Sequence, residues 1–402
     1  MKNKVLTGLL LVLIGGWGNL LAQNAGSNYA RQVNTLIGTK GVGLTSGYLY
    51  PGATYPYGMV QFTPSYFSKR SGFVINQLSG GGCEHMGNFP TFPVKGKLKM
   101  SPDNILNYRI NISEEKGHAG YYEAMVQEDI KAKLTVTERT GMASYEYPAD
   151  QQYGTVIIGG GISATPIEQA AIVITAPNKC EGYAEGGNFC GLRTPYKVYF
   201  VAEFDADALE SGTWKRDELK PNTTFAEGEY SGVYFTFDVS KKKNVQYKIG
   251  VSYVSVENAR ENLKAENTGW DFLQIQNQAE SKWNHYLGMI EVEGTNPDRT
   301  TQFYTHLYRS FIHPNVCSDV NGEYMGADFR VHKSRSKHYT SFSNWDTYRT
   351  QIQLLSMLDP EVASDIVISH QLFAEEAGGA FPRWVMANIE TGVMQGDPTP
   401  IL

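Results

Sequence analysis

Cysteine and concentrated positive charge are scarce in this chain, and each absence excludes a class of protein. Among 402 residues there are four cysteines, Cys83, Cys180, Cys190 and Cys317, which are too few for a disulfide-rich scaffold. None of them has the spacing of a zinc site. The formal net charge is −6, and the longest basic block is the three lysines at 241–243. Because phosphate binding needs a concentrated positive face, the composition predicts no nucleic-acid partner.

Long apolar runs are also scarce, and the most prominent apolar stretch lies near the N-terminus. Residues 1–22 combine Lys2 and Lys4, an apolar stretch at 9–15 and the small residue Ala22, a pattern typical of a signal peptide. The apolar stretch is too short to span a bilayer, and no other segment has the length of a transmembrane helix. We therefore predict that the mature protein is exported and has no membrane span.

Cys180 and Cys190 flank a glycine-rich segment, and two interpretations of this pair stay open. In an oxidising compartment the two thiols can form a local disulfide. Alternatively, both cysteines are free thiols in a loop. The sequence alone favours neither interpretation.

Strand patterns dominate the chain up to about residue 255. In VYFTFDV (233–239) apolar residues alternate with others, and the segment 244–254 repeats this period of two. Glycine and proline separate such runs, as they do between strands. The pattern predicts an antiparallel β-sandwich at residues 23–257. Strands do not alternate with helices, so a doubly wound parallel sheet is not expected.

A helical spacing of apolar residues begins near residue 258. It predicts a helical linker at 258–290 and further helices at 291–402, so the fold class is α+β with several domains. One helix is marked by Asp359 as its N-cap and by a stop at the glycines 378–379. So few helices would leave their apolar faces uncovered, and we expect the second domain to be incomplete. The apolar positions with helical spacing are Trp283, Leu287, Ile290, Phe303, Leu307, Phe311, Tyr348, Ile352 and Leu355.

Several stretches together resemble one enzyme family. VNTLIGTKGVGLTSGYLYPGATYPYGMVQFTPS (33–65) and GYYEAMVQEDIKAKLTVTERTGMASYEYP (120–148) lie in the strand region. The segments 307–328, 342–361 and 380–398 lie in the helical region. This combination resembles glycoside hydrolase family 92, the calcium-dependent exo-acting α-mannosidases. The resemblance implies a β-sandwich, a helical linker and an α/α toroid, with the active site between sandwich and toroid.

The resemblance also implies an activity, the hydrolysis of terminal α-mannosides of glycans with inversion. Inversion needs two carboxyl groups on opposite sides of the anomeric carbon, and the family places both beyond the position of Leu402. No catalytic residue and no metal ligand is therefore assigned within this chain, although a calcium ion is implied as cofactor. Glu375 and Glu376 are interpreted as the solvated end of a helix.

Two further expectations accompany this activity. Together with the signal peptide, the resemblance predicts export to the periplasm or cell surface of a Gram-negative bacterium. The alternative function is a non-catalytic carbohydrate-binding β-sandwich protein. Neither of these two functions predicts an oligomeric state.

FSNWDTYR (342–349) is the first candidate for sugar contact. The resemblance implies that Asp346 accepts hydrogen bonds from hydroxyls of the terminal mannose, that Trp345 forms an apolar wall, and that Arg349 holds the carboxylate. The structural alternative is that Asp346 caps a helix and that Trp345 belongs to the core.

The loop at 380–398 is the second candidate. Asp397 either reaches the sugar pocket or is a turn carboxylate before a proline. Arg383 and Trp384 either shape the pocket or belong to the core.

The glycine-rich segment SGGGCEHMGNFP (79–90) is the third candidate. Its glycines allow the backbone to approach a ligand closely, and Cys83 matches the family pattern. Glu84 and His85 depart from the commonest version of that pattern, which leaves the linkage preference open. Their polar groups can nevertheless form hydrogen bonds with sugar hydroxyls. The alternative is a tight structural turn.

Overall fold

The structure of the protein is a computed structural model that describes residues 28–40, 47–65, 72–103, 111–394, 396 and 399. The predicted signal peptide at 1–22 lies outside these described residues. Within them, no helix combines the length and the apolar character that crossing a membrane requires.

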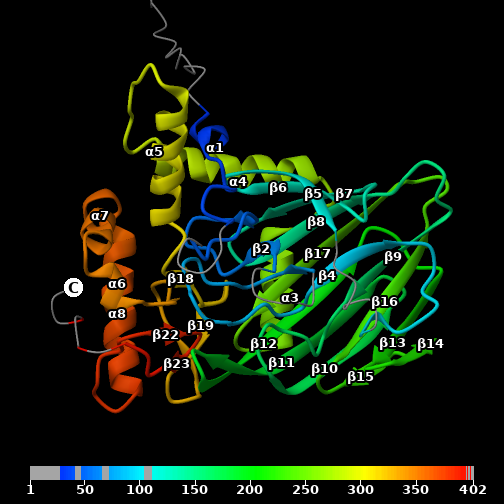
Figure 1. Cartoon of the computed structure of the whole chain (residues 1–402). Helices are drawn as coiled ribbons and strands as arrows, with labels where there is room; N and C mark the ends of the chain where they lie inside the picture. The colour runs from blue at the N-terminus through cyan, green and yellow to red at the C-terminus, as the bar shows by residue number, and fades with distance from the viewer. Residues whose placement is uncertain are drawn as a thin grey trace, which may run out of the picture.

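Two antiparallel sheets form the N-terminal part and face each other (Figure 1). The first sheet consists, in spatial order, of β1 (Ala53–Thr54), β2 (Gln61–Pro64), β3 (Phe73–Val74), β4 (Thr91–Lys95), β9 (Tyr153–Ile158), β16 (Ser231–Asp238), β13 (Glu210–Lys215) and β14 (Glu218–Pro221). The second sheet consists of β15 (Phe225–Glu227), β10 (Ile167–Ala176), β11 (Lys179–Phe189), β12 (Leu192–Phe204), β17 (Asn244–Ser252), β8 (Thr140–Glu146), β7 (Ile130–Val136), β6 (Tyr121–Val126) and β5 (Ile112–His118). The predicted antiparallel sandwich is confirmed.

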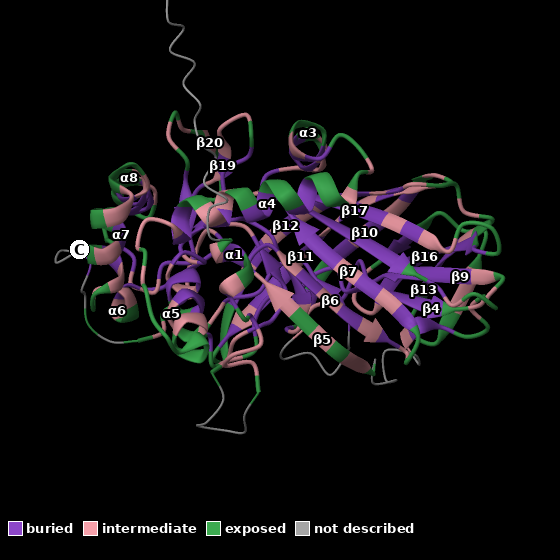
Figure 2. Ribbon diagram, turned by 90° about the horizontal axis from the view of Figure 1, so that it is seen from above, coloured by how far each residue is buried: buried purple, intermediate pink, exposed green. Residues whose placement is uncertain are grey.

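Aromatic side chains fill the space between the two sheets. Phe235 and Phe237 on β16 lie with ring centroids 4.8 and 5.1 Å from Phe204 on β12 of the opposite sheet. Tyr247 on β17 lies 5.3 Å from the same ring. Side chains alternate along a strand, so these residues share one face of each sheet. Figure 2 shows that the strands are largely buried.

The β7–β8 hairpin contains a glycine that lies within a strand and not in the turn. The chain turns at residues 137–139, and Gly141 lies inside β8. A Cβ atom at Gly141 would lie 2.8 Å from Phe62 Cδ1 on the first sheet. The glycine therefore permits close packing of the sheets rather than the turn.

The region predicted as one linker helix forms two helices. α3 (Val256–Glu266) begins at the N-cap Ser255 and packs against β12 and β17, and α4 (Phe272–Leu287) begins at the N-cap Asp271. Asn267 and the residues up to Asp271 are not helical, so the helical pattern is interrupted there.

α4 lies across β6, β7 and β8 and joins the sandwich to the helical part (Figure 1). Trp283 on α4 is fully buried and donates its Nε1–H to the Thr54 carbonyl at 2.7 Å. Its ring centroid lies 4.5 Å from that of Tyr308 on the next helix, α5 (Pro297–Ser310). One side chain therefore contacts the first sheet, the linker and the helical part.

Short helices and hairpins follow α5. The helix predicted through residues 348–355 is broken at Thr350, which has a φ of 71°, into α6 (Asn344–Thr347) and α7 (Gln351–Leu358). The predicted start of α8 (Pro360–Glu376) is confirmed, since Asp359 accepts from Val362 N at 3.1 Å. The remaining elements are α1 (Tyr29–Gln32), β18 (Asn315–Val316), β19 (Glu323–Met325), β20 (Val331–Lys333), β21 (Tyr339–Thr340), β22 (Val385–Met386) and β23 (Ile389–Glu390).

A buried carboxylate connects the sandwich, the linker and the segment after β18. Asp319 is 2% exposed and accepts from Ser252 Oγ at 2.6 Å, from Asn258 Nδ2 at 2.9 Å and from Asn262 Nδ2 at 2.6 Å. Burial raises the pKa of Asp319, and the three hydrogen bonds oppose this shift. One buried side chain thus joins three chain segments through hydrogen bonds.

Candidate functional site

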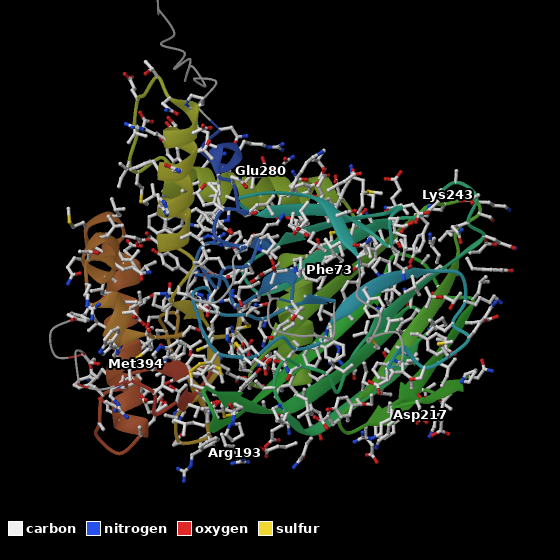
Figure 3. The ribbon with its side chains drawn as sticks, viewed as in Figure 1. Phe73, Arg193, Asp217, Lys243, Glu280 and Met394 are labelled. Carbon is white, nitrogen blue, oxygen red and sulfur yellow. A yellow bond between two sulfur atoms is a disulfide. The ribbon has the colours of Figure 1, made fainter. Side chains whose placement is uncertain are left out.

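A cavity of about 410 Å³ lies where the sandwich meets the helical part. Residues from five separate stretches of the chain line it: Leu78, Ser79, Gly80, Gly81, Gly82, Cys83, Phe189, Cys190, Arg309, His313, Ser341, Ser343, Asp346, Thr347, Gln351, Trp384, Val393 and Met394. Figure 3 labels Met394 on the helical side, far from Asp217 and Lys243 at the opposite end of the sandwich.

The glycine-rich loop 78–83 forms the sandwich side of the cavity and is held by two histidines. Leu78 N donates to His85 Nε2 at 2.9 Å, and Ser79 N donates to His313 Nε2 at 2.8 Å. His85 lies on the sandwich, whereas His313 follows α5, so both parts of the protein position the loop. Its backbone is thereby presented to the cavity in one conformation.

These hydrogen bonds require both imidazole rings to be neutral. Each Nε2 accepts, so each Nδ1–H donates, from His85 to the Cys83 carbonyl at 2.7 Å and from His313 to Asn315 Oδ1 at 2.6 Å. Burial lowers the pKa of His85 and of His313 to about 4, which keeps them neutral at pH 7.

The structure contradicts the interpretation that His85 forms hydrogen bonds with sugar hydroxyls. Its side chain is 0% exposed and supports the loop from behind. Glu84 is exposed and is not among the residues that line the cavity. Of the three candidates in this segment, the structure places Cys83 on the cavity wall.

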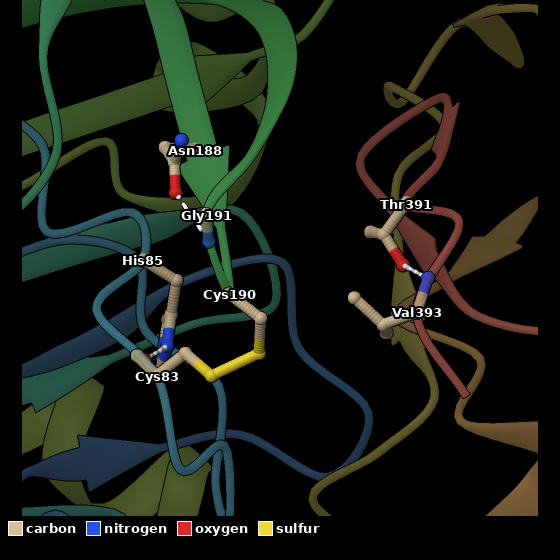
Figure 4. Close-up of a disulfide and its surroundings, with 7 residues drawn as sticks. All are labelled: Cys83, His85, Asn188, Cys190, Gly191, Thr391 and Val393. Atoms are coloured by element: carbon tan, nitrogen blue, oxygen red, sulfur yellow. Dashed lines mark hydrogen bonds between the residues drawn. A yellow bond between two sulfur atoms is a disulfide. The ribbon is translucent and has the colours of Figure 1, made fainter.

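A disulfide joins Cys83 to Cys190, so both interpretations of Cys180 and Cys190 are wrong (Figure 4). Cys180 is a free, buried thiol near the start of β11, and Cys190 follows the end of the same strand. A strand of that length holds its ends roughly 30 Å apart, which excludes a bond between them. The disulfide instead attaches the glycine-rich loop to the β11–β12 turn.

Removing this disulfide is expected to lower the free energy of unfolding by about 2–5 kcal/mol, because the bond closes a long loop in the unfolded chain. The two cysteines are separated by 107 residues. Urea unfolding of Cys83→Ser, of Cys190→Ser and of the double variant measures the effect. If the bond is the only contribution, all three variants lose the same free energy. Additive losses, or none, would contradict the pairing.

Asp346 forms the helical side of the cavity. It is the third residue of α6, it is exposed, and it accepts a hydrogen bond from Ser343 Oγ. Ser343, not Asp346, occupies the N-cap position, so the expected capping role does not fit. The carboxylate and the glycine-rich loop thus line the same cavity.

Trp345 and Arg349 lie beside the cavity rather than in its wall. The Arg349 guanidinium lies 4.4 Å from the centroid of the Trp345 ring, and its Nε donates to Tyr348 Oη at 2.9 Å. The expected ion pair between Arg349 and Asp346 is absent among the described residues. A cation–π contact holds these two side chains together instead.

The loop after α8 completes the cavity with Trp384. This side chain is buried, and its ring centroid lies 4.6 Å from that of Phe189 at the end of β11. Arg383 does not line the cavity, because its Nη1 donates to the Met394 carbonyl at 3.1 Å within the loop. Asp397 lies outside the described residues, and its predicted sugar contact stays a prediction.

Sequence reasoning missed Arg309 and His313 on the cavity wall. Arg309 donates to the Thr35 carbonyl at 2.7 Å and to the Tyr50 carbonyl at 3.1 Å. Its Nε is buried and has no hydrogen-bond partner within the part of the chain that the structure describes. Both residues lie in the segment 307–328, so their polar character at the end of an amphipathic helix was the available signal.

The cluster of metal-ligand side chains found among the described residues does not suit a calcium ion. Three side chains of ligand type come together at Asp328, His332 and Glu376. Calcium prefers six to eight oxygen ligands, whereas this group offers two carboxylates and an imidazole nitrogen. Glu376 also corrects an expectation: it is not solvated, because its side chain is 7% exposed and accepts from Tyr324 Oη at 2.7 Å.

Comparison with known proteins places these features in a family. Residues 32–252 match the glycosyl hydrolase family 92 N-terminal domain, and residues 258–402 match the glycosyl hydrolase family 92 catalytic domain. A protein of Arthroderma benhamiae, described as an uncharacterized secreted glycosidase, is 26% identical over 363 residues, or 80% of this chain and 45% of that protein.

Two solved structures from Bacteroides thetaiotaomicron are similar in fold. A family GH92 α-mannosidase matches with a TM-score of 0.83 and 26% identity over 92% of this chain and 53% of its own. A family GH92 inverting mannosidase matches with a TM-score of 0.80 and 24% identity over 92% and 51% of the respective chains. The chain spans about half the length of these relatives. Since the two domain matches extend over most of its residues, the chain belongs to glycosyl hydrolase family 92.

Proposed function

We propose that this protein is the N-terminal portion of an exported, exo-acting α-mannosidase that inverts the anomeric centre. The observation that carries the proposal is the shared cavity, in which the glycine-rich loop of the N-terminal domain faces Asp346 of the catalytic domain. One of the similar family structures contains mannoimidazole, which supports a mannose-containing glycan as the substrate.

The cavity has the size and the groups to hold a terminal sugar. Its volume of about 410 Å³ lies in the range of roughly 300–1,000 Å³ that is usual for small-ligand sites. The Asp346 carboxylate can accept hydrogen bonds from sugar hydroxyls. Trp384 supplies an apolar surface. These groups bind and orient the sugar, and none of them transfers the proton.

The acid and the base must come from elsewhere. Asp346 is the one carboxylate among the described residues that line the cavity, and inverting hydrolysis needs two. We propose that both reside in sequence beyond Leu402, in the remainder of the α/α toroid that residues 291–402 begin. The ligands of the implied calcium ion are proposed to lie there as well.

Replacing Asp346 by asparagine in the gene product that extends past Leu402 is expected to lower kcat/KM for an aryl α-mannoside by about 100-fold or more. The amide keeps the shape of the side chain but loses the charge that strengthens hydrogen bonds to sugar hydroxyls. Asp298→Asn, an exposed carboxylate in the first turn of α5, is the matched control and should leave kcat/KM unchanged.

The same measurement separates hydrolysis from binding alone. Proton NMR of the wild-type reaction should show β-mannose as the first product, and EDTA should lower the rate. An extended protein that binds methyl α-mannoside but releases no mannose would favour the non-catalytic carbohydrate-binding alternative. Equal rates for Asp346→Asn and wild type would remove Asp346 from the sugar site.

A further inference from the structure

Three side chains of metal-ligand type meet outside the cavity, between the β19–β20 hairpin and the end of α8. Asp328 lies in the hairpin turn, His332 on β20, and Glu376 is the last residue of α8. His332 Nε2 lies 2.9 Å from Asp328 Oδ1 and 4.0 Å from Glu376 Oε1. Ligands about 2.1 Å from a first-row ion lie roughly 3–4 Å from one another, so these two separations suit a common ion, and all three ligand atoms lie within 4.8 Å of one another.

Glu376 provides a separate reason for a cation at this place. Its side chain is 7% exposed, and its carboxylate accepts from two neutral donors, Tyr324 Oη at 2.7 Å and Ala327 N at 3.0 Å. Among the described residues, no lysine or arginine nitrogen lies within 4.0 Å of it. Burying a carboxylate without a cation costs free energy, and a divalent ion beside Oε1 would remove that cost.

Gly326 leaves the space between the three side chains open. A Cβ atom there would lie 2.6 Å from His332 Cδ2, 2.8 Å from Asp328 Oδ1 and 2.8 Å from Glu376 Oε2. Its φ is not positive, so the backbone conformation does not require glycine. Any other residue would therefore press against all three side chains.

Backbone groups fix the orientation of both carboxylates. Arg330 N donates to Asp328 Oδ1 at 3.0 Å, and Ala327 N holds the other oxygen of Glu376. Such contacts orient ligands before the ion arrives. Asp328 and His332 are partly exposed, so an ion and a completing water have access from solvent.

We propose that Asp328, His332 and Glu376 bind a first-row divalent cation of the zinc class. One imidazole nitrogen with two carboxylates is a donor set for such ions and not for calcium. The ion attaches the β19–β20 hairpin to the end of α8. The proposal is independent of the mannosidase activity, because none of the three residues lines the cavity.

Titration of ZnCl₂ into tag-free, EDTA-treated protein by isothermal calorimetry tests the site. We expect one ion per chain and a rise of the unfolding temperature with zinc. His332→Ala and Glu376→Gln should each weaken binding by about tenfold or more. His306→Ala, an exposed histidine on α5, should bind as the wild type does.

Two further measurements keep the test decisive. His332→Ala should unfold at the wild-type temperature in EDTA, which shows that lost binding is not lost folding, and CaCl₂ alone should give no binding at this site. Zinc affinity that is absent in the wild type, unchanged in His332→Ala, or matched by calcium would overturn the proposal.

Discussion

Between pH 6.5 and pH 4 the protein is expected to lose several kcal/mol of stability, because buried histidines are neutral in the folded state. Burial lowers the pKa of His85 and His313 to about 4 and that of His338 to about 3. In the unfolded chain these rings have a pKa of about 6.5. The unfolded state therefore binds more protons in this interval, so stability is complete above pH 6.5 and falls as the pH decreases.

The expected loss of stability follows from the pKa shifts of the histidines. At pH 5 each ring contributes a loss of about 1–2 kcal/mol, and His313 contributes the smaller amount because it keeps some exposure at the cavity. Protonation of His85 or His313 also breaks the hydrogen bonds that hold the glycine-rich loop. Burial lowers the pKa of His370 to about 4 as well, and the hydrogen bond to the Ile366 carbonyl opposes this shift.

Urea unfolding at pH 7.5, 6 and 5 measures this loss. His338→Phe removes one titrating ring and keeps the stacking on Tyr324, whose ring centroid lies 3.7 Å away. The difference in the free energy of unfolding between pH 7.5 and pH 5 should be smaller by about 1–2 kcal/mol in this variant than in the wild type. His306→Gln, at an exposed site, should not change it. A stability that is constant over this range would contradict the neutral histidines.

Replacing Asp319 by alanine is the second change with a large expected effect, a loss of about 3–5 kcal/mol in the free energy of unfolding. The substitution leaves Ser252 Oγ without its acceptor and weakens the contacts of Asn258 and Asn262 in a site that water does not reach. The sandwich, α3 and the segment after β18 would lose their common polar contact. Because burial raises the pKa of Asp319, the folded state binds protons at this carboxyl more readily than the unfolded state, so the loss is expected to be larger at acidic pH than at pH 7.5.

Urea unfolding at pH 7.5 with two companion variants tests this effect. Asp319→Asn should also destabilise the protein, because the asparagine NH₂ group is a donor and would face other hydrogen-bond donors. Asp217→Ala, at the far end of the sandwich in Figure 3, should change stability by less than about 0.5 kcal/mol. Wild-type stability of Asp319→Ala would show that the buried hydrogen bonds contribute nothing at the junction.

Local patterns were sufficient for much of the fold. The period of two in 233–239 and 244–254 placed β16 and β17, because alternation along a strand depends only on neighbouring residues. Asp359 and Pro360 marked the start of α8 for the same reason, since a helix cap is completed within one turn. The combination of motifs also identified the family.

Contacts between distant residues could not be read in this way. Cys83 and Cys190 are 107 residues apart, and their bond depends on how β11 is placed against the glycine-rich loop. His85 is polar in sequence, but the fold buries it behind that loop. Glu376 looked solvated, yet the β19–β20 hairpin covers it.

The sequence by itself therefore determined the strands, the main helices and the family, because periodicity and caps act over a few residues. The tertiary structure alone decided which polar groups are buried, which cysteines are bonded and which residues face the cavity. The physical reason is that burial, desolvation and disulfide geometry depend on segments far apart in the chain, which meet only when it folds.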